Sequence, residues 1–237
     1  LDSLDVDIET LFSDAMKSSV VLDPPTLVDM TNALFAKFGE ELTSVALPHT
    51  WNSIDGQDGD NDYYRGTCYY AKKLDKSELP KADQYYLEFR GVNSSAVVYA
   101  NGKEIASHDG GYSTWRVNVT EVLTDKTLFV IAVDNAVSDR VYPQSADFTF
   151  YGGMYRDVNI IAVNESHFDL DYYGGPGIQV TPEITGNDAK VKVEVYVTNK
   201  KNHQKIDYRL KDANGNIICE TIGDGTEVVF SIPNVHL

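Results

Sequence analysis

Cysteine is scarce in this sequence. The 237 residues contain only Cys68 and Cys219, which lie 151 positions apart. A disulfide framework needs several paired cysteines and a structural zinc site needs clustered ligands, so neither is expected here. Long hydrophobic runs are missing as well, because the longest, such as residues 128–133, are far shorter than a bilayer span. No basic segment followed by an apolar stretch opens the chain, so we expect neither a signal peptide nor a membrane partner.

Basic residues are also few. The chain has 20 Lys and Arg against 36 Asp and Glu, a formal net charge of −16 at pH 7. Residues 1–62 hold 13 of the acidic residues and only two lysines, Lys17 and Lys37. Such a surface repels a phosphate backbone, so nucleic acid is not expected as a partner.

Helical periodicity is confined to the first 40 residues. Two sets of apolar residues recur there at helical spacing, on either side of Pro24-Pro25, and Asp23 is placed to cap the second set. The sets are Leu4, Ile8, Leu11, Phe12 and Ala15, then Leu27, Met30, Leu34, Phe35 and Phe38. Residues 1–40 are therefore predicted to be a short helical N-terminal extension, with a partly ordered arm as the alternative.

From Val45 onward the pattern is that of an all-β protein. Short runs rich in β-branched and aromatic residues recur without helical crossovers, and Asn101-Gly102 is typical of a tight hairpin turn. The runs in this region are residues 66–73, 84–90, 96–100, 114–119, 127–134 and 155–163. This spacing predicts a jelly-roll-like β-sandwich over residues 41–164.

The strand pattern restarts near residues 164–166. Residues 190–197 alternate almost perfectly between polar and apolar, the mark of a strand with one solvated face. Further strands are predicted at residues 167–173, 178–181, 205–210, 217–221 and 228–232. Residues 165–237 are thus predicted to be a second, immunoglobulin-like β-sandwich, and an incomplete one, because such a fold takes roughly 100 residues.

The segment 48–66 carries the most distinctive local chemistry. It combines Pro48-His49-Thr50-Trp51-Asn52 with a stretch rich in Gly, Asp and aromatic residues. Sugars need such groups, because carboxylates and amides bind hydroxyls and flat rings cover the apolar face of a pyranose. A calcium loop is the first alternative, since Asp58, Asp60 and Asp62 match its first ligand positions. Tyr63 and Tyr69 stand where that loop requires Gly and Glu, so no metal site is expected. The second alternative is a surface loop without function.

An ordered set of motifs resembles the N-terminal region of family 2 glycoside hydrolases, and most of all the β-galactosidase type. The segments that carry the resemblance are residues 48–52, 61–66, 89–92, 98–102, 108–112, 133–135, 146–158 and 167–168. Together they cover residues 45–237 at the family's spacing, so the whole set is far more specific than any single motif. Residues 1–40 depart from the family pattern, which leaves open how the first strand of the jelly roll is completed.

The resemblance implies particular roles for three residues. Asp147 corresponds to a family carboxylate that reaches into the active site and accepts hydrogen bonds from galactosyl hydroxyls, in some members also holding a sodium ion. Asn61 is the best match to a companion residue, with Asp62 or Asp60 as alternatives because the loop varies in length.

The resemblance gives structural roles to the other distinctive side chains. Arg156 and Asp157 are expected to brace the loop that carries Asp147. His49 and Trp51 are expected to pack and anchor their own loop rather than to contact the sugar.

The resemblance also implies what the chain lacks. Retaining glycosidases need two carboxylates about 5–5.5 Å apart, and the family carries both on a (β/α)8 barrel, of which no alternating helix–strand pattern appears here. We therefore expect a non-catalytic segment with no cofactor, which acts on a galactoside substrate together with that barrel. An autonomous carbohydrate-binding module or a pure scaffold remains the alternative, and the sequence leaves homo-oligomer formation open.

Overall fold

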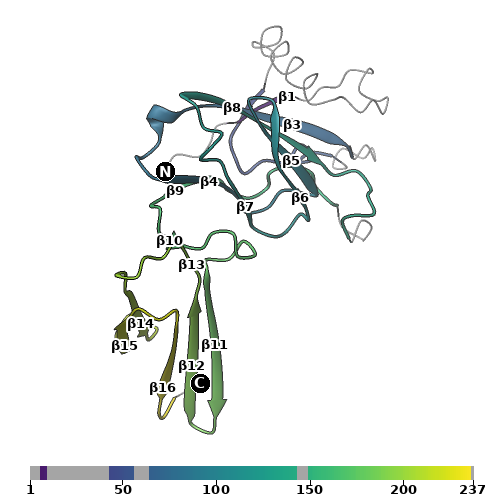
Figure 1. Ribbon diagram of the computed structural model, residues 1–237. Coiled ribbons are helices and arrows are strands. Elements are labelled where there is room, and N and C mark those ends of the chain that lie inside the picture. Colours follow the sequence, from purple (N-terminus) through teal and green to yellow (C-terminus); the bar gives the residue numbers. More distant parts are fainter. Residues whose placement is uncertain (1–5, 10–42, 56–63, 143–148, 236–237) are drawn as a thin grey trace. The chain divides into compact units, whose positions relative to one another are not determined.

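The computed structural model describes residues 6–9, 43–55, 64–142 and 149–235. The chain divides into two compact units, Leu1–Ala162 and Val163–Leu237 (Figure 1). Within the described residues the regular structure is β-strand, apart from one 3-10 turn at Lys76–Glu78. The prediction of an all-β fold is confirmed. In the described residues, no helix has the length and hydropathy that a membrane span requires.

The first unit consists of two sheets. The larger has six strands in the order β2 (Thr43–Val45), β1 (Val6–Glu9), β3 (Thr67–Asp75), β8 (Lys126–Asp134), β5 (Ser95–Ala100) and β6 (Lys103–Asp109). The smaller has three, in the order β7 (Trp115–Asn118), β4 (Gln84–Phe89) and β9 (Val158–Val163). Figure 1 shows the strands of the larger sheet on one side of the unit and β4, β7 and β9 on the other.

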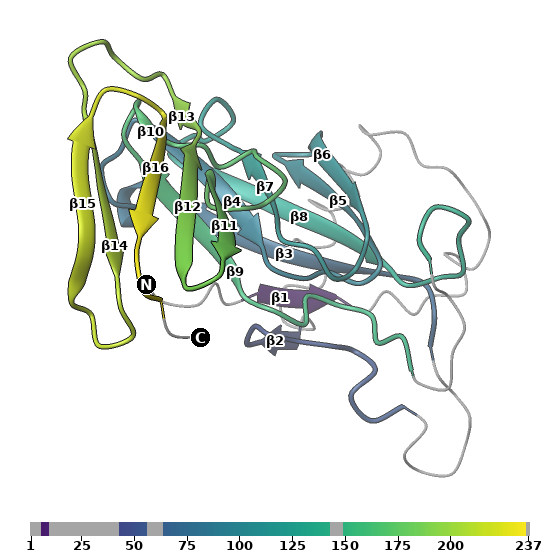
Figure 2. The same cartoon turned by 90° about the horizontal axis from the view of Figure 1, so that it is seen from below.

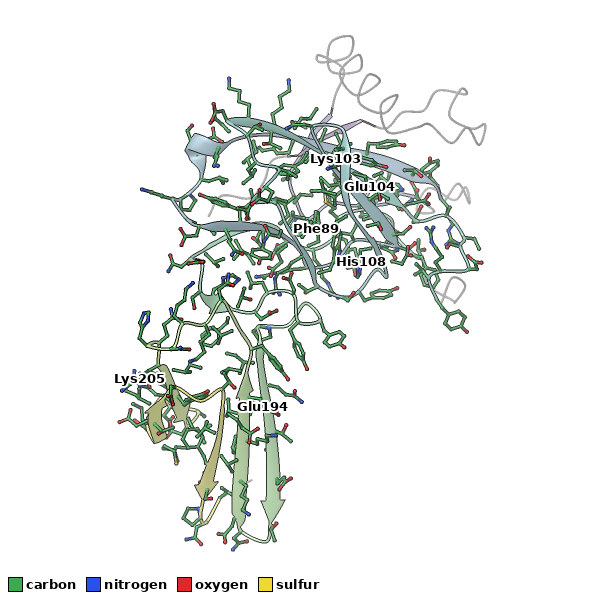
Figure 3. The ribbon with its side chains drawn as sticks, in the orientation of Figure 1. Phe89, Lys103, Glu104, His108, Glu194 and Lys205 are labelled. Atoms are coloured by element: carbon green, nitrogen blue, oxygen red, sulfur yellow. The ribbon has the colours of Figure 1, made fainter. Side chains whose placement is uncertain are left out.

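The core of the first unit lies between these sheets. Alternate residues of β5 are buried, as the period of a strand requires, and Ala96, Val98 and Ala100 face inward. They meet Phe89 from β4, which is fully buried and labelled in Figure 3. Burying one such large apolar side chain contributes roughly 1.5–3 kcal/mol, so this layer is the main source of stability for the unit.

Residues 6–9 correct the prediction of a helical N-terminal extension. They form β1, which pairs antiparallel with both β2 and β3 and sets Ile8 opposite Thr43 on one side and Tyr70 on the other. Val-Asp-Ile-Glu alternates apolar and polar residues, so the same Ile8 that fits a helical spacing also fits a strand. Residues 6–9 form a strand rather than a helix because the edge of β3 would otherwise be unpaired. The rest of residues 1–40 lies outside the described residues.

The second unit has a three-stranded sheet, a hairpin and one short strand pair. The sheet runs β11 (Ile178–Thr185), β12 (Asp188–Val195), β16 (Glu227–Ile232). The hairpin joins β14 (Ile206–Lys211) to β15 (Ile217–Gly223), and β10 (His167–Phe168) pairs with β13 (Val197–Thr198). Figure 2 shows the hairpin beside β16. Tyr208 from the hairpin packs with Val191, Val195 and Phe230 from the sheet, which forms a second, smaller core.

The strand predicted at residues 167–173 is shorter in the structure and ends at Phe168. Asp169 stops it, because its carboxylate accepts hydrogen bonds from the backbone N–H groups of Asp171 and Tyr172 at 2.8 and 2.9 Å. Residues 169–177 form a loop instead, since a side chain that bonds its own following backbone competes with sheet pairing.

Candidate functional site

The three predicted site residues lie outside the described residues. Asn61 and Asp62 belong to segment 56–63 and Asp147 to segment 143–148, and Asp60 lies in the first of these as well. The residues that border both segments are described. They converge on two buried asparagines, which make the base of the candidate site.

Asn52 holds the two ends of segment 56–63. Its side chain is fully buried, and its Nδ2 donates to Asp55 Oδ2 at 2.6 Å and to the Tyr64 carbonyl at 2.8 Å. The Tyr64 N–H in turn donates to the same Asp55 oxygen at 3.1 Å. Asp55 and Tyr64 are the last and first described residues on either side of the segment, so its two ends are fixed to each other.

The same Asn52 reaches the region after segment 143–148. Its Oδ1 accepts the Gly152 N–H at 2.7 Å and the Nδ2 of Asn135 at 3.2 Å. Asn135 is also fully buried, directly after the end of β8, and its Nδ2 lies 3.2 Å from the Phe150 carbonyl. One network of side-chain amides therefore anchors both flanks of segment 56–63 and the residues that follow segment 143–148.

Asn135 further ties this network to the sheet. Its Oδ1 accepts the Gly66 N–H at 2.9 Å, and its backbone carbonyl accepts from Arg65 Nε at 2.9 Å. Gly66 immediately precedes β3, whose first residue pairs with the last residue of β8. A buried polar group left without a partner costs roughly 1–3 kcal/mol, so this fully bonded arrangement fixes one conformation at the end of the sandwich.

The Gly152-Gly153 turn brings the chain against residues 49–51. Gly153 has φ +126°, and a Cβ there would lie 2.5 Å from the His49 carbonyl oxygen and 2.7 Å from the Tyr70 hydroxyl. A hydrogen bond holds the two parts of the chain together, since Thr50 Oγ1 donates to the Gly152 carbonyl at 2.6 Å. Only glycine meets both requirements at position 153.

His49 and Trp51 have the packing roles that the sequence suggested. His49 Nδ1 lies 3.1 Å from the hydroxyl of Tyr70, and the two rings meet edge to face. Burial lowers the pKa of His49 and raises the pKa of Tyr70. Trp51 packs against the core and against Gly152, where any Cβ would collide with the indole.

Arg156 and Asp157 also have structural contacts, and the segment that they were predicted to brace lies outside the described residues. Arg156 Nη1 donates to the carbonyls of Tyr112 and Arg90 at 2.9 and 3.4 Å, and its guanidinium lies 5.3 Å from the centre of the Tyr155 ring. Asp157 pairs with Arg90 at 3.4 Å. Both side chains thus connect β9 to the turns after β4 and β6.

Neither Asn52 nor Asn135 was predicted from the sequence to be a site residue. Both stand inside quoted motifs, and each follows an apolar or aromatic run, but the 83 positions between them leave no local signal of their contact. Among the described residues, no group of three or more His, Cys, Asp or Glu side chains is placed to hold a metal ion. The described geometry offers a rigid, polar base beside segments 56–63 and 143–148.

Comparison with known proteins shows which proteins the chain is similar to. Residues 60–169 match the family model described as glycosyl hydrolase 2 galactose-binding domain-like. Over 198 residues, 80% of the chain, the sequence is 31% identical to a β-glucuronidase of Bacteroides fragilis, of which it covers 28%. It is 25% identical over 210 residues to a β-galactosidase of Thermoanaerobacter pseudethanolicus, covering 86% of the chain and 26% of that protein.

A solved structure shows the same fold. The crystal structure of an FMN-binding β-glucuronidase from Faecalibacterium prausnitzii L2-6 superposes with a TM-score of 0.77 and 38% sequence identity, over 83% of this chain and 31% of that one. The chain thus spans less than a third of the length of these relatives.

Proposed function

We propose that the chain, whose residues 60–169 carry a galactose-binding-like domain of family 2 glycoside hydrolases, is the non-catalytic, substrate-side N-terminal part of such an enzyme. The observation that carries the proposal is the Asn52–Asn135 network. It fixes both flanks of segment 56–63 and the residues after segment 143–148 to one end of the sandwich. Flanks that are fixed before a ligand arrives reduce the entropy lost on binding, which suits two segments that contact one ligand.

The proposed contacts to the sugar are Asp147, Asn61 and Asp62. A carboxylate accepts strong charge-assisted hydrogen bonds from hydroxyls, and an amide both donates and accepts, so together they suit vicinal hydroxyls of a pyranose. Asp147 is the principal contact in this proposal, and Asn61, with Asp62 as its alternative, is the companion.

The catalytic carboxylates would be supplied by a barrel outside this chain. The relatives are named as glycosidases and are more than three times the length of the matched region, which leaves room for a catalytic domain. In this proposal residues 41–164 form the jelly-roll sugar-binding domain and residues 165–237 part of an immunoglobulin-like domain. The substrate is then held between the loops of the first domain and the barrel.

The proposed substrates are terminal β-galactosides, on the strength of the motif set at residues 48–52 and 146–158. Terminal β-glucuronides are the second candidate, because the relatives with 31% and 38% identity are named β-glucuronidases and the named β-galactosidase is 25% identical. Parallel assays of the barrel-containing enzyme on chromogenic β-galactoside and β-glucuronide would separate the two.

The purified 237-residue chain tests the non-catalytic assignment. We expect no turnover of either chromogenic substrate above the buffer rate, because half of the pocket and both reacting carboxylates are missing. Detectable turnover that follows the chain through purification would overturn the proposal. Micromolar binding of free glycans by the chain would instead favour the autonomous carbohydrate-binding module, and a barrel-containing enzyme indifferent to Asp147 would favour a scaffold.

A further inference from the structure

The second unit displays a cluster of three tyrosines, Tyr172, Tyr173 and Tyr196, that has no part in the site described above. The Tyr172 and Tyr196 rings are stacked with centroids 4.1 Å apart and an interplanar angle of 16°. The ring of Tyr173 meets Tyr172 edge to face at 5.0 Å and 76°. Tyr173 is nevertheless 91% exposed, so its ring is supported from one side and open to solvent on the other.

The loop that carries the cluster is held rigidly. Asp169 binds two backbone N–H groups of its own loop and accepts from Thr198 Oγ1 at 3.2 Å. Its N–H donates to the Tyr196 carbonyl at 2.9 Å, and the Tyr196 N–H donates to the Gly177 carbonyl at 2.8 Å. Gly177 has φ +69°, and a Cβ there would lie 2.6 Å from the Asp169 carbonyl oxygen, so this closure requires glycine.

Tyr173 combines an exposed side chain with a left-handed backbone conformation. Its φ is +48°, a region that a bulky residue adopts rarely and at a cost. A large aromatic side chain kept in solvent in that conformation gains nothing for the core of the unit. Surface aromatics of this kind, fixed before any ligand arrives, are characteristic of binding sites.

Charged groups lie near Tyr196. Glu194 on β12, labelled in Figure 3, pairs with Lys192 Nζ at 3.2 Å, and Glu227 on β16 pairs with the same ammonium at 3.2 Å. The hydrogen bond with Tyr172 raises the pKa of Tyr196, and the charges of Glu194 and Lys192 act on the same hydroxyl. Ammonium, carboxylate and phenol groups next to an apolar ring are the complement of a molecule that is flat and apolar on one face and rich in hydroxyls at its rim.

We propose that Tyr173, supported by Tyr172, is a stacking platform for a pyranoside, and that Lys192 and Glu194, the charged neighbours of Tyr196, bind the sugar's hydroxyls. The site is separate from segments 56–63 and 143–148, and it rests on the proposed function only for the choice of a sugar as ligand. Its stacking contact needs only a pyranose C–H face, so galactosides and glucosides should both bind, and weakly.

The experiment uses the whole 237-residue chain and methyl β-galactopyranoside, with saturation-transfer NMR and titration as readouts. We expect saturation of the sugar's C–H protons, and binding about threefold to tenfold weaker in Tyr173→Ala, the range that one aromatic contact contributes. Tyr173→Phe keeps the ring and should bind as the unsubstituted chain does. Tyr142→Ala, a control at a tyrosine of the first unit that is 92% exposed, should also leave binding unchanged.

Three results would overturn the platform. Binding that is the same in Tyr173→Ala and the unsubstituted chain would exclude the ring as the contact. Binding lost in Asp147→Asn but kept in Tyr173→Ala would place the sugar in the proposed loop site instead and support the proposed function. Absence of any sugar signal, together with self-association in sedimentation that disappears in Tyr173→Ala, would make the cluster a protein contact.

Discussion

At the scale of single residues, the buried polar side chains have the clearest consequences. Asn52→Ala would remove one hydrogen-bond partner each from the Gly152 N–H, the Tyr64 carbonyl and Asp55. We expect a loss of about 2–4 kcal/mol in the free energy of unfolding, measured in urea, because several buried groups lose their hydrogen bonds. The exposed Asn202→Ala should stay within about 0.5 kcal/mol of the unsubstituted protein. Equal stabilities for the two variants would refute the anchoring role of Asn52.

The two cysteines should differ sharply in reactivity. Cys68 is 3% exposed, and burial together with the charge of Asp134 raises the pKa of its thiol to about 12. The thiolate is the reactive species, so Cys68 should be inert at pH 8. We expect a thiol-specific chromogenic reagent to modify one cysteine per native chain, Cys219, and two after unfolding in urea. Modification of Cys68 in the native chain at the rate of Cys219 would contradict this.

Glu88 makes stability depend on pH. It is 4% exposed and binds Arg90 at 2.9 Å and Arg116 at 2.7 Å. Burial alone would raise the pKa of Glu88, but the hydrogen bonds and charges of the two arginines outweigh it, so the pKa lies below its usual 4.5. A depressed pKa contributes stability above about pH 4.5, and that contribution is lost as the pH falls through the folded-state value.

Glu88→Gln should therefore lower the free energy of unfolding at pH 7 by about 3–5 kcal/mol, since it removes the buried carboxylate that pairs with both Arg90 and Arg116. The difference from the unsubstituted protein should shrink as the pH falls below about 4, in urea unfolding followed by fluorescence. Glu183→Gln, on the exposed face of β11, is the matched control. A deficit for Glu88→Gln that does not change with pH would contradict the assignment.

At the scale of elements, the turn at Gly152-Gly153 gives the sharpest test. Gly153→Ala combines a positive φ with a collision against the His49 carbonyl, whereas Gly215→Ala has φ +86° and open space around its Cβ. Backbone strain should lower the free energy of unfolding of both variants by roughly 1–2 kcal/mol. The collision should destabilise Gly153→Ala further. Thermal unfolding followed by circular dichroism measures the difference. A Gly153→Ala protein as stable as Gly215→Ala would show that the turn has room to move.

Strand positions were predictable where polar and apolar residues alternate and the same residues do not also fit a helical spacing. Residues 190–197 were predicted as a strand because polar and apolar residues alternate there, and residues 190–195 lie in β12. Prediction failed at residues 6–9, where Ile8 fits both periods, and after Phe168, where the Asp169 carboxylate ends the strand. The base of the candidate site could not be predicted, because Asn52 and Asn135 are brought together only by the pairing of β3 with β8 and by the Gly152 turn.

At the scale of the whole molecule, the chain consists of two separate β units without a described catalytic centre. Its similarity to glycosidases covers less than a third of their length. In the proposed function, Asp147 binds the sugar in a pocket that is completed by a catalytic barrel outside this chain.

The most direct measurement is the steady-state kinetics of Asp147→Asn in the enzyme that joins this chain to its barrel, beside the exposed control Asp139→Asn. A hydrogen bond to a charged group contributes roughly 1.5–3 kcal/mol, so we predict that Asp147→Asn lowers kcat/KM for its β-glycoside by about 10- to 150-fold. Asp139→Asn should leave it unchanged. Identical kcat/KM values for Asp147→Asn and the unsubstituted enzyme would contradict the account.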